Sequence, residues 1–438
     1  MVVHEATIYE GQLELTAGEF RRPVAGRVWA SLVPRPTVRI SIDTGSLTDA
    51  PDLLGADAIV RFGGQHEAHR ALFAQTNDSV SNGKSTSTAR GIILGTQPST
   101  GLVDELTFEL INFPARAVPY SDGPIVVEGW WLELMPTLTP QDFAKVVEGE
   151  ALFVTTYSAL LCREDGKPFS AAHGLRVLDV VRVALSFAAG ARVGLWNLRA
   201  ALAGGRTSWL ALESPNVAPW YSRHQWLSIF DRVGLITILE ALLRRHSHNE
   251  ETWDVDQLLI AYHAEANGVP PMEMRIAAAQ SGLELISWDH LVESGDPTLG
   301  QSRSQRKNVY TALSASAVME MMIHEASLPL AIPPSAAQLT PLGVRDGDAT
   351  GTSTGPVALA RVRNAVTHPR RRHGDLSYPH GVWFAAWRLS VHYLELLILR
   401  RLGYTGAYVD RFSAVWHGDI QQVPWSTQQG NGQMGEGQ

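Results

Sequence analysis

The chain has 438 residues, of which 45% are hydrophobic and 18% charged, a composition that is typical of folded globular proteins and excludes a largely disordered chain. The formal net charge of −8 excludes a protein whose whole surface coats nucleic acid, but it leaves room for a local basic site. The single cysteine, Cys162, excludes an intramolecular disulfide and a zinc site built from cysteines. Because we find neither a secretory signal nor an uninterrupted apolar run of about eighteen residues, we expect a cytoplasmic, soluble protein with no membrane partner.

Residues 1–135 are predicted to form a β-rich N-terminal domain, either a sandwich or a barrel. Short segments rich in β-branched residues alternate with clusters of Gly, Pro, Ser and Asp, which is the pattern of strands joined by turns. The clearest predicted strands are residues 38–43, 90–94, 106–111 and 124–128. The polar stretch Asp78–Thr88 is predicted to be a mobile loop.

Residues 136–250 form a mixed α/β middle region, which is either separate or continuous with the N-terminal domain. Residues 151–162 are a predicted strand. Apolar residues recur at helical spacing over residues 173–187 and again over residues 226–244, so both segments are predicted helices.

Residues 251–412 are predicted to be an all-α domain, and the polar, glycine-rich residues 413–438 a flexible tail. Within this domain the apolar spacing predicts helices over residues 256–267, 270–291, 306–325, 356–368 and 381–402. Gly403 is the expected C-cap of the last helix. The fold class is therefore α+β, with a β-rich N-terminal domain followed by a helical bundle.

The end of the short predicted helix at residues 356–368 carries the motif on which a functional hypothesis rests. It reads Arg363-Asn364-Ala365-Val366-Thr367-His368. Cleavage of RNA without a metal needs proton transfer at the 2′-hydroxyl and at the leaving 5′-oxygen, together with a cation at the phosphate. Histidine suits the proton transfers, and the planar guanidinium of arginine suits the phosphate.

The spacing of these residues is compatible with one site. In a helix, Arg363 and His368 flank one groove, and Asn364 shares a face with His368, so that its amide is able to hold the imidazole. Pro369 is expected to leave His368 near the helix end. An acid-free basic patch surrounds the motif and is the predicted RNA-binding surface: Arg361, Arg370, Arg371 and Arg372.

Arg363-Asn364 followed by His368 resembles the R-(N/D/H)-X3-H motif of the HEPN superfamily. The layout around it, with an earlier helix that contains residues 279–284, a Pro-rich break and a long final helix that ends before Gly403, looks like the C-terminal half of ApeA-like bacterial defence proteins. The resemblance covers about residues 255–412. Those proteins also carry a β-rich N-terminal domain.

The resemblance implies a HEPN helical bundle that dimerises and joins two motifs in one composite site. It implies a metal-independent endoribonuclease that leaves 2′,3′-cyclic phosphate and 5′-hydroxyl ends and uses no cofactor. Arg363 would then stabilise the phosphate, His368 would transfer protons, Asn364 would position, and Glu284 would pair with Arg363. The expected substrate is tRNA or mRNA, the expected role is abortive infection in anti-phage defence, and a phage-derived trigger or regulatory partner is expected at the N-terminal domain.

A second hypothesis is a non-catalytic HEPN scaffold that dimerises and binds a partner protein or nucleotide.

Other motifs are interpreted as structural. The G-x-S-x-G match at residues 351–355 lacks a preceding apolar strand and predicts Ser353 or Thr354 as a helix N-cap. The P-loop-like residues 82–85 are predicted to lie in a surface loop. The paired histidines are interpreted as exposed helix-end residues rather than metal ligands: His66 and His69, His246 and His248.

Overall fold

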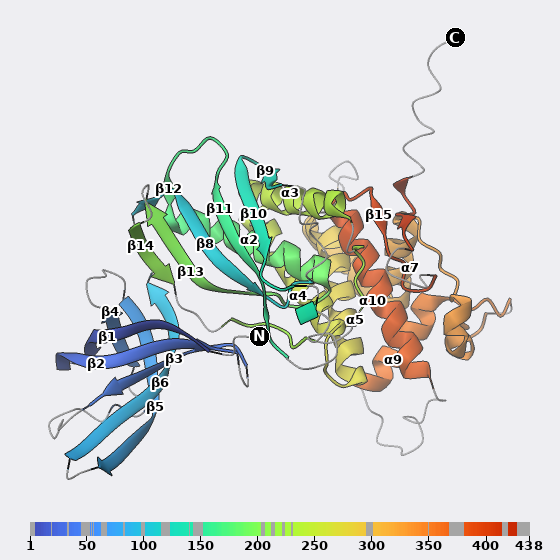
Figure 1. Cartoon of the computed structure of the whole chain (residues 1–438). Coiled ribbons are helices and arrows are strands. Elements are labelled where there is room, and N and C mark those ends of the chain that lie inside the picture. Colours follow the sequence, from blue (N-terminus) through green and yellow to red (C-terminus); the bar gives the residue numbers. More distant parts are fainter. Residues whose placement is uncertain are drawn as a thin grey trace. The chain divides into compact units, whose positions relative to one another are not determined.

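The computed structural model shows an α+β protein whose β-rich N-terminal part precedes a helical C-terminal part (Figure 1). Two compact units are present, one of residues 1–182 and 193–222 and the other of residues 183–192 and 223–438. The structure describes residues 5–18, 20–32, 35–44, 53, 55, 57–62, 68–81, 84–97, 101–114, 123–139, 141–142, 152–202, 206–211, 215–220, 224–228, 231–294, 301–348, 350–367, 381–413 and 419–426.

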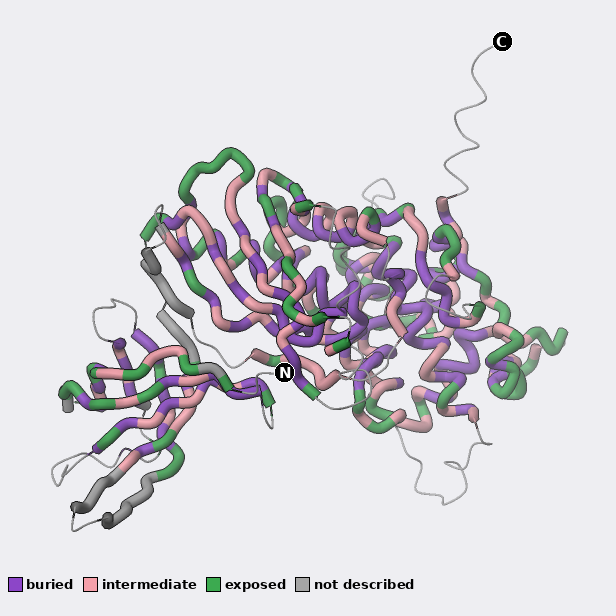
Figure 2. The backbone as a smooth tube through the Cα atoms, viewed as in Figure 1, coloured by how far each residue is buried: buried purple, intermediate pink, exposed green. Residues whose placement is uncertain are grey.

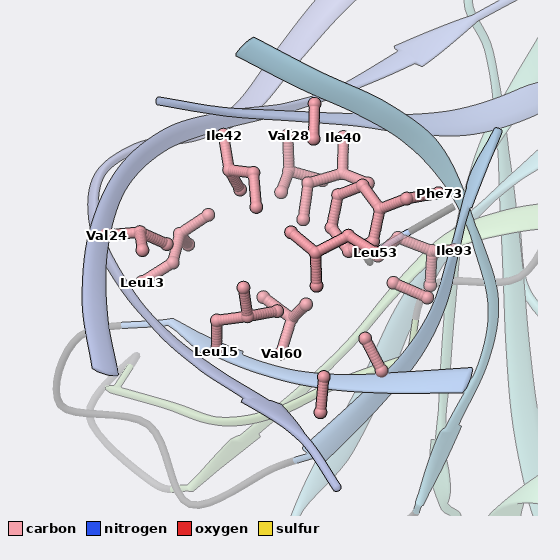
Figure 3. Close-up of a cluster of buried hydrophobic side chains, with 14 of the residues drawn as sticks. Leu13, Leu15, Val24, Val28, Ile40, Ile42, Leu53, Val60, Phe73 and Ile93 are labelled. Carbon is pink, nitrogen blue, oxygen red and sulfur yellow. The ribbon is translucent and has the colours of Figure 1, made fainter. Parts of the chain in front are cut away.

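The first six strands form a closed antiparallel barrel in the order β1-β2-β3-β6-β5-β4. Of the two architectures expected for residues 1–135, the structure therefore has the barrel over strands β1 to β6, whereas β8, β9 and β10 belong to a second sheet. Alternate residues point inward and fill it with apolar side chains, as Figure 3 shows for Leu13, Leu15, Ile40 and Phe73. The strands are β1 (Glu5–Ala17), β2 (Phe20–Ser31), β3 (Thr37–Asp43), β4 (Asp57–Phe62), β5 (Ala68–Ser81) and β6 (Lys84–Gln97).

The polar stretch Asp78–Thr88 was predicted to be a loop, and the structure corrects this prediction. Strands β5 and β6 run through it and stay paired from Ala68 with Gln97 to Ser81 with Lys84. The residues between the two strands lie outside the described part of the chain. Backbone pairing satisfies the N–H and C=O groups here, and Thr is favourable in strands, so a polar composition does not prevent a long hairpin.

His69 corrects a second prediction. It lies in β5 rather than at a helix end, its side chain is fully buried, and its ring stacks on Phe62 with 4.5 Å between the ring centroids. Burial lowers the pKa of His69 to about 4. The neighbouring His66 lies outside the described residues, whereas His246 and His248 end helix α3 (Arg232–His248) as expected.

Gly91 of β6 is expected to be intolerant of any side chain. A Cβ atom at this position would lie 2.3 Å from the carbonyl oxygen of Leu72 and 2.9 Å from the Cα atom of Phe73. We expect Gly91→Ala to lower the free energy of unfolding by about 1–3 kcal/mol, because the barrel backbone must move apart. Urea denaturation followed by circular dichroism measures this. Leu94→Ala on the same strand is the control, because Leu94 is 46% exposed, and an equal effect of the two changes would contradict the prediction.

Six further strands form an antiparallel sheet in the order β14-β13-β8-β11-β10-β9. Strands on both sides of residue 135 pair directly, since β10 pairs with β11 and β8 pairs with both β11 and β13. The predicted strands at residues 106–111, 124–128 and 151–162 correspond to β8, β9 and β11. The strands of the sheet are β8 (Glu105–Ile111), β9 (Ile125–Val127), β10 (Trp130–Pro136), β11 (Thr155–Arg163), β13 (Gly194–Leu202) and β14 (Arg206–Ala211).

Smaller elements accompany the sheet. Two short strands, β7 (Leu102–Val103) and β12 (Phe169–Ser170), form a separate pair. Helix α2 (Ala171–Ala189) follows and confirms the helix predicted over residues 173–187. A Cβ atom added at Gly174 of α2 would lie 2.6 Å from the side chain of Leu106 in β8, so the start of this helix packs closely on the sheet.

The second unit is built mainly of helices. Its remaining elements are α3, α4 (Glu250–Ala266), α5 (Met272–Trp288), the π-helix η1 (Asp289–Glu293), α6 (Arg303–Ala312), α7 (Ala315–Glu325), the 3₁₀-helix η3 (Pro334–Leu339), α8 (Thr340–Gly343), α9 (Gly355–Thr367), α10 (Val382–Arg401), β15 (Ala407–Tyr408) and β16 (Gln421–Gln422).

Two predicted helices differ in the structure. The single helix expected over residues 306–325 is two helices, because Ser314 accepts a hydrogen bond from the backbone N–H of Ala317 and caps the second one, α7. The helix expected over residues 270–291 ends as an α-helix at Trp288 and continues as the π-helix η1.

Helix α10 is the central helix of this unit and contacts α4, α5, α7 and α9. It is the one described helix that is long and apolar enough to cross a membrane, but 78% of the relevant window is buried within the protein, which is usual for a core helix (Figure 2). Gly403 follows it with a φ of 69° and closes its C-terminus as predicted.

Candidate nucleic-acid site

The motif helix α9 begins where the sequence predicted it and places Arg363 at the protein surface. Thr354, one of the two predicted N-caps, precedes the helix and accepts a hydrogen bond from the backbone N–H of Val357 at 3.5 Å. Val362 is fully buried, Asn364 is exposed, and the side chain of Arg363 is 26% exposed. Val362 therefore anchors the helix in the core, while Arg363 and Asn364 stay accessible to a ligand.

Arg363 forms an ion pair with Glu284 of α5, the residue expected to pair with it. Its Nη2 atom donates to Glu284 Oε1 at 2.5 Å, and its Nη1 atom donates to Asn364 Oδ1 at 3.5 Å. The side chain of Glu284 is 47% exposed. Such exposed pairs contribute only about 0–1 kcal/mol, so a phosphate that binds both guanidinium nitrogens is able to compete for Arg363.

Arg361, predicted to belong to the same basic patch, lies on another side of α9. Two residues along a helix are rotated by about 200° from each other, and Arg361 accordingly donates to the carbonyl oxygen of Leu342 at 3.2 Å and pairs with Asp346. The patch around Arg361 is therefore not acid-free. His368, Arg370, Arg371 and Arg372 lie outside the described residues.

An aromatic pair adjoins the Arg363–Glu284 pair. Trp288 follows Glu284 by four residues and shares its face of α5. It meets Tyr310 of α6 edge to face, with 5.2 Å between the ring centroids and 82° between the planes. Burial raises the pKa of Tyr310, Glu284 raises it further and Arg363 opposes this, so both charges act on the phenol. Sequence reasoning missed Tyr310.

A buried ion network holds α4, α10 and the segment after α10 together. Glu395 of α10 is fully buried and accepts three hydrogen bonds at Oε2: from His263 at 3.0 Å and from Arg411 at 2.7 and 3.2 Å. Burial alone would raise the pKa of Glu395, but Arg411 and His263 outweigh it and the net pKa lies below the usual value. The sequence signal for this network was a lone acid inside the apolar run 394–399.

A second ion network joins four elements at the C-terminal end of α10. Asp256 of α4 accepts hydrogen bonds from Arg245 of α3 at 2.5 and 3.1 Å and from Arg401 of α10 at 2.6 Å. Arg401 also pairs with Asp289 of the π-helix. The second network thereby fixes η1, which continues α5, against the central helix.

No described group of three or more His, Cys, Asp or Glu side chains is arranged to hold a metal ion. The paired histidines His246 and His248 lie in the last turn of α3, and His248 contacts the carbonyl oxygen of Arg244 in its own helix.

Comparison with known proteins relates two stretches of the chain to YopA. Residues 249–422 match the family model of the YopA C-terminal domain, and residues 99–223 match that of the YopA central domain. The chain is 23% identical over 283 residues to the SPbeta prophage-derived uncharacterized protein YopA of Bacillus subtilis strain 168, an alignment that covers 63% of the chain and 59% of that relative. No solved structure matches. The HEPN resemblance stays a prediction.

Proposed function

We propose that the helical unit is a metal-independent HEPN-type endoribonuclease with Arg363, Asn364 and His368 as its catalytic motif. The observation that carries this proposal is the position of Arg363, which is anchored by a weak, exposed pair with Glu284 beside the exposed Asn364. Arg363 stabilises the phosphorane, His368 transfers protons and Asn364 positions the imidazole or the phosphate. The cleavage products carry 2′,3′-cyclic phosphate and 5′-hydroxyl ends.

The rest of the proposal concerns the setting of this activity. Two copies join their motifs in a dimer, Arg370, Arg371 and Arg372 bind the RNA backbone, and the substrate is tRNA or mRNA. The protein is cytoplasmic and acts in anti-phage defence, with a phage-derived trigger or a regulatory partner at the β-rich part.

One observation favours the alternative of a non-catalytic scaffold. The guanidinium of Arg363 is already engaged by Glu284, which is the arrangement of an arginine that serves packing between α5 and α9. In this alternative the same helices dimerise and bind a partner protein or nucleotide.

The experiment compares wild type with His368→Ala on induction in bacteria, with total RNA profiled and its 3′ ends mapped. We expect the wild type to be toxic and to release discrete fragments with cyclic phosphate ends, and the variant to cleave at least about 100-fold more slowly, because general acid–base catalysis contributes about 10²–10⁴-fold. His248→Ala, which changes an exposed histidine at the end of α3, is the matched control.

A purified sample with a chelator present tests metal independence, and cleavage should continue. Equal RNA cleavage by wild type and His368→Ala would remove His368 from the mechanism. Loss of cleavage in the chelator would overturn the metal-independent chemistry. Dimerisation through the helical unit without cleavage of any tested RNA, with or without phage infection, would favour the scaffold.

A further inference from the structure

A pocket of about 520 Å³ lies between the π-helix η1, α6 and α7. Its walls include the apolar side chains of Leu291, Val309, Leu313 and Met321 and the ring of Tyr310. Val309 is 54% and Met321 46% exposed, so described residues leave these side chains uncovered. The volume lies within the range of about 300–1,000 Å³ that is typical of small-molecule sites.

The polar wall of this pocket presents a carboxylate. Glu325, the last residue of α7, pairs with His290 of the π-helix. The His290 Nε2 atom lies 2.9 Å from Glu325 Oε1 and 3.0 Å from Oε2. A carboxylate has about four lone-pair sites, so Glu325 is able to accept further hydrogen bonds beside that from His290. An apolar slot with an aromatic ring and one carboxylate suits a flat heterocycle that carries two neighbouring N–H donors.

Tyr310 connects the pocket to the Arg363–Glu284 pair. Tyr310 lines the pocket and meets Trp288 edge to face, and the charges of Glu284 and Arg363 both act on its phenol. Because Glu284 also binds Arg363 directly, the Tyr310–Trp288 contact and the Glu284–Arg363 pair link the pocket to the position of the phosphate.

Hydrogen bonds hold the pocket in shape. Arg306 of α6 lines it and donates to the carbonyl oxygens of Val292 at 2.9 Å and Gln301 at 2.7 Å, and thereby ties α6 to the π-helix. Glu293 accepts from Trp288 Nε1 at 2.8 Å and from Arg303 at 2.5 and 2.6 Å. The π-helix itself is a rare element that is frequently found at functional sites. A pocket fixed in this way loses little entropy when it binds a ligand.

We propose that this pocket binds an unpaired guanine base of the RNA next to the phosphate held by Arg363, an inference that rests on the proposed function. The base packs against the ring of Tyr310, and its adjacent N1–H and N2–H donors bind the carboxylate of Glu325. Guanine is the one standard base with two adjacent donors on its Watson–Crick edge, because adenine, cytosine and uracil each place an acceptor beside a donor. Unpaired RNA bases are commonly recognised through aromatic packing and this edge.

The test measures binding of full-length protein to fluorescent 2′-O-methyl RNA hexamers, which lack the attacking hydroxyl. The probes are an all-adenine hexamer and the same hexamer with one guanine or one inosine, since inosine lacks the N2 amine. We expect the guanine probe to bind at least about tenfold more tightly than the all-adenine probe, with inosine in between. Glu325→Gln should abolish the preference for guanine, and Tyr310→Ala should weaken binding about tenfold or more.

Tyr310→Phe keeps the ring and is the matched control, with binding close to that of wild type. Circular dichroism verifies that each variant is folded, and Glu325→Gln, whose side chain is 59% exposed in wild type, keeps the test decisive if Tyr310→Ala does not fold. Equal binding of the three probes by wild type would overturn the inference. So would an unchanged preference for guanine in Glu325→Gln.

The outcomes separate this inference from the nuclease proposal. Cleavage that depends on His368 but is indifferent to guanine and to Glu325 overturns the pocket and keeps the nuclease. A guanine preference that depends on Glu325, without any cleavage, keeps the pocket and overturns the nuclease. If Met321→Glu changes the oligomeric state in size-exclusion chromatography and leaves RNA binding unchanged, the pocket is a protein interface instead.

Discussion

Arg411→Ala is expected to lower the free energy of unfolding of the helical unit by about 3–5 kcal/mol, because it leaves a buried carboxylate without its main cation. Arg411 is 3% exposed and Glu395 is fully buried. The guanidinium supplies two of the three hydrogen bonds at Glu395 Oε2, at 2.7 and 3.2 Å. Guanidinium denaturation followed by circular dichroism and tryptophan fluorescence measures the loss.

Two comparisons make this prediction specific. The double change Glu395→Leu with Arg411→Met replaces both charges by apolar groups and should recover much of the lost stability, since a buried pair and an apolar pair of similar volume are often equivalent. Arg345 is 54% exposed and pairs with Glu320. Arg345→Ala should therefore lower the free energy of unfolding by less than about 1 kcal/mol. Equal losses for Arg411→Ala and Arg345→Ala would contradict the account.

Acidification below pH 6.5 is expected to destabilise the helical unit strongly. Burial, the largest cause, lowers the pKa of His392 to about 4 and that of His224 to about 4, and it also lowers the pKa of fully buried His263. The unfolded chain therefore binds protons that the folded chain does not. The contribution of these groups to the free energy of unfolding is fully present above pH 6.5 and is lost as the pH falls toward 4. For His392 alone this loss is roughly 3 kcal/mol, because one pKa unit corresponds to about 1.4 kcal/mol. Glu395 adds to the effect below pH 4.5, since its pKa is lowered as well.

Denaturation curves at intervals from about pH 7.5 to about pH 4.5 measure this dependence. His392→Leu should reduce the slope of the free energy of unfolding against pH by the equivalent of about one proton, because it removes one of the buried titrating groups. His392 Nδ1 makes no hydrogen bond with described residues, although Asp410 Oδ1 lies 3.6 Å away, so the change should cost little at neutral pH. His248→Leu at an exposed site is the matched control, and its curve should parallel that of wild type. A wild-type stability that is independent of pH in this range would refute the prediction.

Much of the helical unit was predictable because its long helices have a strong apolar period and clear end signals. Helix α10 ends before Gly403 and α9 begins after Thr354, as the capping residues indicated. The break between α6 and α7 was missed, because an apolar period continues across Ser314 and only the cap interaction with Ala317 separates the helices. The paired strands around residues 82–83 were missed because backbone pairing with a distant partner outweighs a polar composition.

The candidate site was predictable only in part. The sequence pointed to Arg363 and Asn364, and the family resemblance pointed to Glu284 as the partner of Arg363. Neither indicated that Tyr310 adjoins this pair, because only tertiary packing brings Tyr310 of α6 to Trp288 of α5. The basic patch was predicted from residues that are neighbours in the sequence, but helical geometry places Arg361 and Arg363 on different sides of α9.

The sequence by itself determined the α+β class, the positions of most long helices and several strands, and the motif Arg363-Asn364 with His368, because these follow from local periodicity, caps and spacing. Only the tertiary structure decided that the first strands close into a barrel, that Glu395, His263 and Arg411 share a buried network, and that Glu325 and Tyr310 line one pocket. These features depend on contacts between residues far apart in the chain. Their free energies come from burial and pairing, which no local pattern records.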